Sequence, residues 1–145
     1  MITELAEYEI IVRLLISLGL GAAIGLEREI RESAAGLRTN TLVCLGATLF
    51  TLVSINLQGP GVDITRIAAQ VVVGIGFIGG GVIFREKSKI IGLSTAATLW
   101  IVAAIGLLVG IGSYFTALIT TILALVILIF GTYIEKSLLK KVKTQ

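Results

Sequence analysis

The sequence predicts an all-α membrane protein in which five helices cross a bilayer and pack into one compact bundle. Only 14% of its 145 residues are charged, whereas roughly a quarter are charged in an ordinary soluble domain. The mean hydropathy is +1.03. The apolar residues fall in segments of nearly the length, about 20 residues, that a helix needs to cross a bilayer.

The expected helices cover about residues 10–27, 39–57, 67–84, 91–109 and 114–133. Charges and turn residues bound the first three. The second ends at the turn QGPG, and the third lies between Arg66 and Arg85.

The last two helices are predicted from the absence of charge. No charged residue lies between Lys89 and Glu135. That interval is too long for one span and suits two, with the glycine-containing GIGSY (110–114) as the hinge. Because the loops are short, residues 1–145 are expected to form a single domain.

The cationic residues are distributed unevenly between the two sides of this topology. Ten of the 12 lie on the side of the C-terminus: Arg28, Arg31, Arg38, Arg85, Lys87, Lys89, Lys136, Lys140, Lys141 and Lys143. The other side holds Arg66, and Arg13 falls in the first span. Lys and Arg are enriched in cytoplasmic loops, so the N-terminus is expected outside and the C-terminus in the cytoplasm.

The segment GLEREIRESAAGLRTN concentrates charge directly after the first apolar run. Only 13 residues separate Arg13 from Glu27, about 20 Å of helix, so at least one of these charges lies at or below the membrane surface. The long side chain of Arg13 can reach the outer headgroups. Glu27 is expected to face the bundle and pair with an arginine. The candidate partners are Arg31 at the favourable i+4 spacing, Arg28 and Arg38.

Glycines are predicted to form the helix contacts. Three spans carry a G-x-x-x-G pair: Gly21/Gly25, Gly76/Gly80 and Gly106/Gly110. Small residues at this spacing let membrane helices approach closely, within one protomer or between two. Gly74, Gly79 and Gly81 extend the third-span set. A glycine run can also break a helix and expose carbonyls to an ion, and the packing interpretation is the stronger one.

The same glycines imitate a nucleotide-binding motif. Gly74, Gly76 and Gly79 have the G-x-G-x-x-G spacing. A dinucleotide site also requires a βαβ unit and an acidic residue about 20 positions later, and the sequence has STAATLW in that region. We therefore expect no nucleotide cofactor. The net charge of +3 does not by itself suggest a nucleic-acid role, and none is expected.

Catalysis is not expected. There is no His and one Cys, which excludes an internal disulfide and the usual His/Cys zinc sites. No nucleophile motif is present.

Three blocks of the sequence resemble the MgtC/SapB family of bacterial inner-membrane proteins: GAAIGLEREIRESAAGLRTNTLVCLGA, RIAAQVVVGIGFIGGGVIF and GLSTAATLWIVAAIGLLVGIGSY. The family pattern, together with the residues' own polarity, singles out Glu27, Arg28, Arg38, Thr39, Arg66, Gln70 and Thr95 as a functional polar cluster. The resemblance implies a multi-pass protein of the inner membrane. The founding member carries a further cytosolic ACT-like domain after its fifth span. Residues 1–145 include only IEKSLLKKVKTQ after the expected fifth span, so no role of that domain is carried over to them.

Family resemblance implies adaptation to magnesium limitation, acid stress or life inside macrophages, and thus a link to virulence. One hypothesis is a regulator that contacts another membrane complex, such as the F-type ATP synthase. The alternative is an oligomeric channel or transporter for Mg²⁺ or another cation. Mg²⁺ binds through one or two carboxylates and retained waters, with Glu27 as the candidate ligand. A homodimer through the glycine faces is expected in either case.

Overall fold

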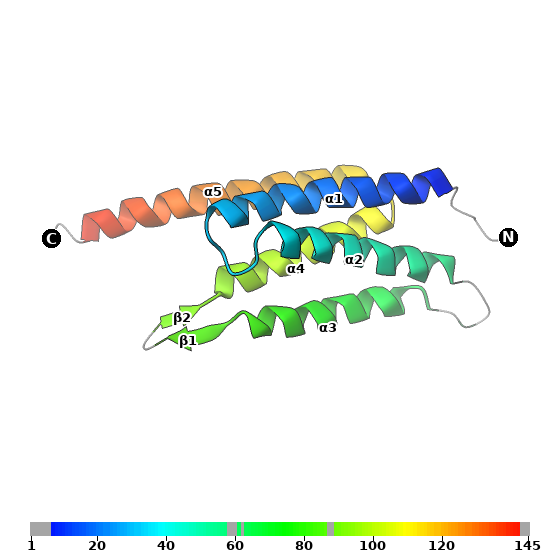
Figure 1. Ribbon diagram of the computed structural model, residues 1–145, viewed down its shortest axis with the longest axis horizontal. Coiled ribbons are helices and arrows are strands. Elements are labelled where there is room, and N and C mark those ends of the chain that lie inside the picture. Colours follow the sequence, from blue (N-terminus) through cyan, green and yellow to red (C-terminus); the bar gives the residue numbers. More distant parts are fainter. Residues whose placement is uncertain (1–6, 58–60, 62, 87–88, 143–145) are drawn as a thin grey trace.

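The computed structural model describes residues 7–57, 61, 63–86 and 89–142, which form five α-helices and one β-hairpin (Figure 1). The elements are α1 (Glu7–Ile30), α2 (Leu37–Asn56), α3 (Thr65–Gly81), β1 (Phe84–Glu86), β2 (Lys89–Ile91), α4 (Leu93–Gly110) and α5 (Tyr114–Val142). The predicted helical fold with five helices is confirmed. The N-terminal residues 1–6, most of the QGPG turn, Lys87 and Lys143 lie outside the described residues.

Four of these helices, α1, α2, α4 and α5, are long and apolar enough to cross a membrane. The remaining helix, α3, is apolar but has 17 residues. The predicted membrane-protein class is therefore confirmed.

The third helix ends earlier than predicted, at Gly81 instead of residue 84. The amides of Val82 and Ile83 donate to the carbonyls of Gly79 and Gly80, and this tighter turn closes the helix. The chain then forms a short antiparallel ladder in which Phe84 pairs with Ile91. Aromatic and β-branched residues favour such a pairing.

The fifth helix is longer than predicted, because it continues past residue 133 to Val142. Its last part, EKSLLKKV, contains neither Gly nor Pro and consists mainly of good helix formers. The charges therefore end the apolar segment without ending the helix.

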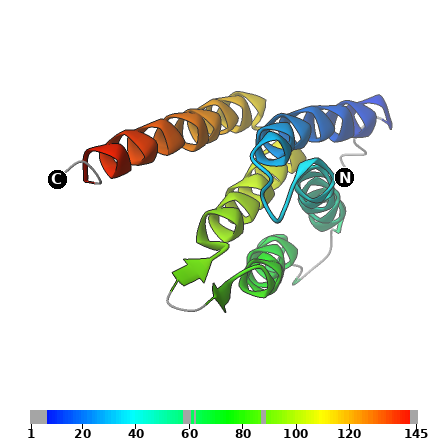
Figure 2. The same ribbon diagram turned by 60° about the vertical axis from the view of Figure 1, so that its left-hand side comes forward.

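Helix α4 lies at the centre of the bundle and contacts the other four helices. Figures 1 and 2 show α2 beside α1 and α4, with α3 and the hairpin on the far side from α5. Within the described part of the chain, α5 contacts mainly α4 and α1.

Glycines of α1 and α4 bring both helices into close contact with α2. A Cβ atom added at Gly21 would lie 2.7 Å from the Cys44 Cβ, and one added at Gly106 would lie 2.7 Å from the Ala47 Cβ. One turn further along, Gly25 meets the backbone of Leu37 and Gly110 meets the side chain of Thr51. Helix α2 is therefore held between two glycine pairs.

The glycines of α3 are placed differently. An added Cβ would meet no atom within 4 Å at Gly74, Gly76, Gly80 or Gly81. At Gly79 it would make an ordinary 3.5 Å contact with Ala96. The helix is also continuous across this run, so the glycines do not break it to expose carbonyls.

Two polar contacts connect the helices within the apolar region. The Thr48 hydroxyl lies 2.9 Å from the Gly106 carbonyl oxygen and donates across to α4. The Arg13 Nη1 donates to the Gly110 carbonyl oxygen at 2.5 Å. Arg13 thus reaches the C-terminal end of α4, where the helix dipole favours a cation.

We predict that Gly21→Ala destabilises the protein by about 1–3 kcal/mol, because its methyl group would overlap Cys44 in a closely packed contact. Gly19→Ala is the matched control on the same helix, since its Cβ would meet no atom within 4 Å. It should be neutral or stabilising by up to about 1 kcal/mol. Unfolding of both variants in mild detergent would measure the difference, and equal stabilities would contradict the packing argument.

Candidate functional site

One end of the bundle gathers the charged segment identified in the sequence. There α1 ends, α2 begins, the hairpin turns, α4 begins and α5 ends (Figure 1). We call this the basic end. Among the described residues with placed side chains it holds Arg28, Arg31, Arg38, Arg85 and Lys89.

Helix α1 terminates in a Schellman-type turn. The Ser33 amide donates to the Arg28 carbonyl and the Glu32 amide to the Glu29 carbonyl, both at 3.0 Å. Glu32 occupies the left-handed position with φ of +53°, where glycine is usual. The turn redirects the chain toward α4.

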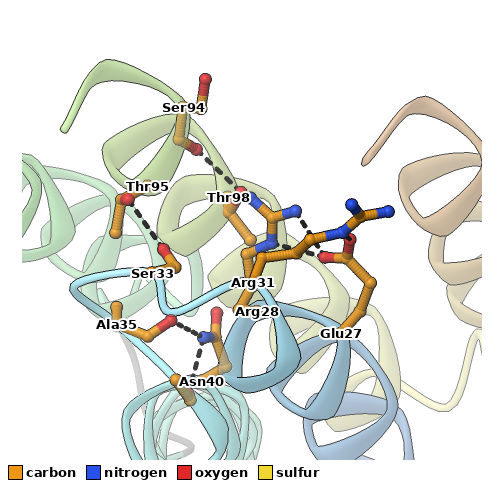
Figure 3. A network of polar contacts seen from close by, with 10 residues as sticks. Glu27, Arg28, Arg31, Ser33, Ala35, Asn40, Ser94, Thr95 and Thr98 are labelled. Carbon is orange, nitrogen blue, oxygen red and sulfur yellow. Dashed lines mark hydrogen bonds and ion pairs between the residues drawn. The ribbon is translucent and has the colours of Figure 1, made fainter. Parts of the chain in front are cut away.

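A hydroxyl pair connects this turn to α4. The oxygens of Ser33 and Thr95 lie 2.9 Å apart (Figure 3), and Thr95 is buried. The neighbouring Thr98 instead donates to the Ser94 carbonyl of its own helix. Of these hydroxyl groups, it is therefore Thr95 that joins the charged loop to α4.

Glu29 provides the cap that α2 lacks in its own sequence. The N-cap residue is Gly36, which has no capping side chain, and the Leu37 amide donates to Glu29 Oε2 at 2.8 Å. A Cβ at residue 36 would overlap this carboxylate. The carboxylate also lies at the positive end of the α2 dipole. Glu29 thus caps α2 while its side chain remains exposed.

Asn40 was not singled out from the sequence, although it is fully buried. Its Nδ2 donates to the carbonyls of Ala35 and Gly36, each at 2.8 Å (Figure 3). These bonds hold the loop against the first turn of α2. Its Oδ1 has no hydrogen-bond partner within the described part of the chain. An Asn in the first turn of a helix, four residues after a Gly, was the available signal, because Asn side chains often bond local backbone groups.

Glu27 pairs with two arginines of its own segment. Its Oε2 lies 2.5 Å from both Nε and Nη2 of Arg28, and its Oε1 lies 3.4 Å from Arg31 Nε. The side chains of Glu27 and Arg28 are 11% and 8% exposed, and that of Arg31 is 33% exposed. The Arg28 pair is therefore the main one, since exposed pairs contribute little.

These contacts argue against Glu27 as a metal ligand. Both of its oxygens already accept from guanidinium groups, which would repel a cation. Across the described residues, no three His, Cys, Asp or Glu side chains are grouped closely enough to hold a metal ion. The geometry around Glu27 does not fit Mg²⁺.

The other candidate residues lie elsewhere. Arg38, Thr39 and Gln70 line a groove of about 650 Å³ between α2 and α3, so Arg38 faces this groove while Arg28 and Arg31 pair with Glu27. Arg66 lies in the first turn of α3, at the opposite end of the bundle. Beside it, the Thr65 hydroxyl and amide donate to Asp63, and these bonds, with a smaller contribution from Arg66, lower the pKa of Asp63.

We predict that Glu29→Ala lowers the free energy of unfolding by about 0.5–2 kcal/mol, the usual effect of losing a helix cap. Glu32→Ala is the control, because the Glu32 side chain makes no hydrogen bond or ion pair with another described residue and its left-handed backbone would remain strained. Thermal unfolding in detergent measures both. Equal and mild effects would show that Glu29 does not cap α2.

We further predict that Glu32→Gly raises the free energy of unfolding by up to about 1 kcal/mol, because glycine adopts the left-handed conformation without the penalty of a side chain. Glu32→Val should lower it, since a β-branched residue is disfavoured there. The same unfolding measurement checks both, and a loss of stability in the glycine variant would contradict the assignment of this turn.

Several curated proteins are similar to this chain. Protein MgtC of Salmonella typhimurium strain LT2 is 52% identical over 117 residues, covering 79% of this chain and 49% of MgtC. An uncharacterized protein of Synechocystis is 48% identical over 118 residues, covering 81% of this chain and 50% of that protein. YhiD of Escherichia coli K12, described as a candidate magnesium transporter, is 42% identical over 127 residues, covering 83% of this chain and 59% of YhiD.

The chain thus spans about half the length of the curated relatives it matches. The comparison with solved structures gives no match. The model of the MgtC family matches residues 14–137. The chain therefore belongs to the MgtC family.

Proposed function

We propose that this chain is a five-span protein of the bacterial inner membrane that regulates another membrane complex during magnesium limitation or acid and intracellular stress. The F-type ATP synthase is the candidate complex. Family membership and the four long apolar helices support the membrane role. The basic end would face the cytoplasm, because Lys and Arg concentrate on that side of membranes.

The fifth span in this proposal is α3. Its 17 residues extend about 26 Å, slightly less than the hydrocarbon core of about 30 Å. It lies alongside α2 and α4, which are themselves candidate spans. An odd number of spans puts the two termini on opposite sides of the membrane, so with the basic end in the cytoplasm the N-terminus would lie outside.

The single observation that favours a regulator over a cation carrier is the pairing of Glu27. A carrier for Mg²⁺ needs carboxylates that exchange ligands with the ion and its waters. Here the candidate carboxylate is neutralised by Arg28 and Arg31. In a regulator the same pair would instead fix the shape and charge of a surface that a partner contacts.

Two faces of the bundle support docking of a partner or of a second copy. The glycines Gly76, Gly80 and Gly81 of α3 have open space around them and do not line the groove between α2 and α3. In the apolar part of α5, Tyr114–Gly131, 11% of the window is buried against the rest of the chain. Close approach of another helix is easiest where small residues lie open, so we place a homodimer or partner contact on these faces.

The alternative function is transport of Mg²⁺ or another cation by an oligomer, and the description of the Escherichia coli relative favours it. Magnesium flux into proteoliposomes tests this directly. Magnesium flux above that of empty liposomes, if it is lost in the Glu27→Gln variant, would overturn the regulator proposal and favour transport. Flux that Glu27→Gln leaves unchanged would also support transport, by a route that does not use Glu27.

For the regulator we predict that the Glu27→Ala variant, expressed in a strain that lacks the protein, fails to restore growth of that strain in magnesium-limited medium. The substitution leaves Arg28 buried without its carboxylate, which typically costs about 3 kcal/mol or more. Membrane levels measured beside growth separate folding from function. Tagged wild type should also capture subunits of the ATP synthase from native membranes.

The double variant Glu27→Gln with Arg28→Gln removes both charges, which is far less destabilising than removing one. We expect it to accumulate like the wild type and still fail to rescue growth. Full rescue by this variant would mean that the pair has only a structural role. Capture of no stoichiometric partner by the wild type would contradict the regulator proposal.

A further inference from the structure

The groove of about 650 Å³ between α2 and α3 has no role in the proposed function. It runs along α2 from Arg38 to Phe50 and along α3 from Ile67 to Ile78. Most of its lining is aliphatic or aromatic, and its polar side chains are Arg38, Thr39 and Gln70. The groove is therefore apolar along most of its length and cationic at one end.

The groove is open because two glycines line it. Gly46 of α2 and Gly74 of α3 both belong to its wall, and an added Cβ at either would meet no atom within 4 Å. The two helices thus face each other without filling the space between them.

Its length matches one leaflet of a bilayer. The 12 helical steps from Arg38 to Phe50 extend about 18 Å along α2, a little more than half of the hydrocarbon core of about 30 Å. The mouth with Arg38 lies at the basic end, which is a membrane surface in either orientation of the protein. An acyl chain of a lipid in the leaflet at that surface runs in the same direction as the groove and has a similar length.

The positive charge of Arg38 at the mouth of the groove favours an anionic lipid headgroup. Arg38 is exposed and makes no ion pair with any described residue, whereas Arg28 and Arg31 both pair with Glu27. The Glu29 carboxylate, at the start of α2, accepts a hydrogen bond from the Leu37 amide. A guanidinium binds a phosphate with two parallel hydrogen bonds. Thr39 beside it adds a hydroxyl donor at the same mouth.

We propose that the α2–α3 groove binds one acyl chain of an anionic phospholipid, with the lipid phosphate on Arg38. This site goes beyond the proposed function, and it requires only that the basic end lies at a membrane surface. The failure of the regulator proposal would leave it standing.

Native mass spectrometry tests the preference for an anionic headgroup. The full chain is released from detergent that contains equal amounts of phosphatidylglycerol and phosphatidylcholine, and the retained lipids are identified. We expect the wild type to retain phosphatidylglycerol, and Arg38→Gln to lose that preference about tenfold, equivalent to about 1.4 kcal/mol. Lys89→Gln is the control, because Lys89 is exposed at the same end and does not line the groove. An equal loss of the phosphatidylglycerol preference in both variants would show that the preference comes from the general surface charge, and it would overturn the proposal.

A second pair of variants tests the acyl chain. Gly74→Leu fills the groove from a position with open space, and leucine favours the helix more than glycine does. We expect it to lower the number of retained lipids of both headgroups severalfold. Gly76→Leu is the control on the same helix, since Gly76 also has open space but lies outside the groove lining. Unchanged lipid retention in Gly74→Leu would overturn the proposal even if Arg38 proved selective.

Discussion

The close approach of α2 to both α1 and α4 is the constraint on which the rest of the structure depends. Cys44 shows it most clearly, because its Cβ lies against Gly21 and its carbonyl lies against Gly106. Lipid provides no hydrophobic drive for helices to associate, so such contacts must supply van der Waals packing and hydrogen bonds. The bond from Thr48 to the Gly106 carbonyl then fixes the register of α2 on α4. With these three helices in place, α3 and α5 are added at the periphery.

The same constraint organises the basic end. Because α1 and α2 are packed closely, the loop between them is short and must reverse the chain within a few residues. Glu32 therefore takes a left-handed backbone, Glu29 reaches across to the start of α2, and Asn40 holds the loop carbonyls. The concentrated charge of this segment is thus divided between capping a helix, pairing with Glu27 and lining a groove.

Much of this could be predicted from local sequence, and some of it could not. Apolar runs between charges located all five helices, since length and hydropathy decide a span. The ends were less well predicted, because the charges after residue 133 stop an apolar segment but not a helix, and the turn after Gly81 depends on tertiary pairing. Burial of Glu27 followed from its distance to Arg13. Its choice of Arg28 over Arg38 depended on how α2 turns away from α1, which sequence spacing does not reveal.

The unequal lengths of the helices have a consequence for the membrane itself. The adjacent helices α3 and α4 have 17 and 18 residues, whereas α1 and α5 have 24 and 29. At 1.5 Å per residue, the first pair measures about 26 and 27 Å, less than an average hydrocarbon core. On the proposed five-span topology the bilayer must thin beside α3, at a cost of fractions of a kcal/mol for each Å of mismatch. Membrane thickness would then act on the protein at the flank that α3 forms.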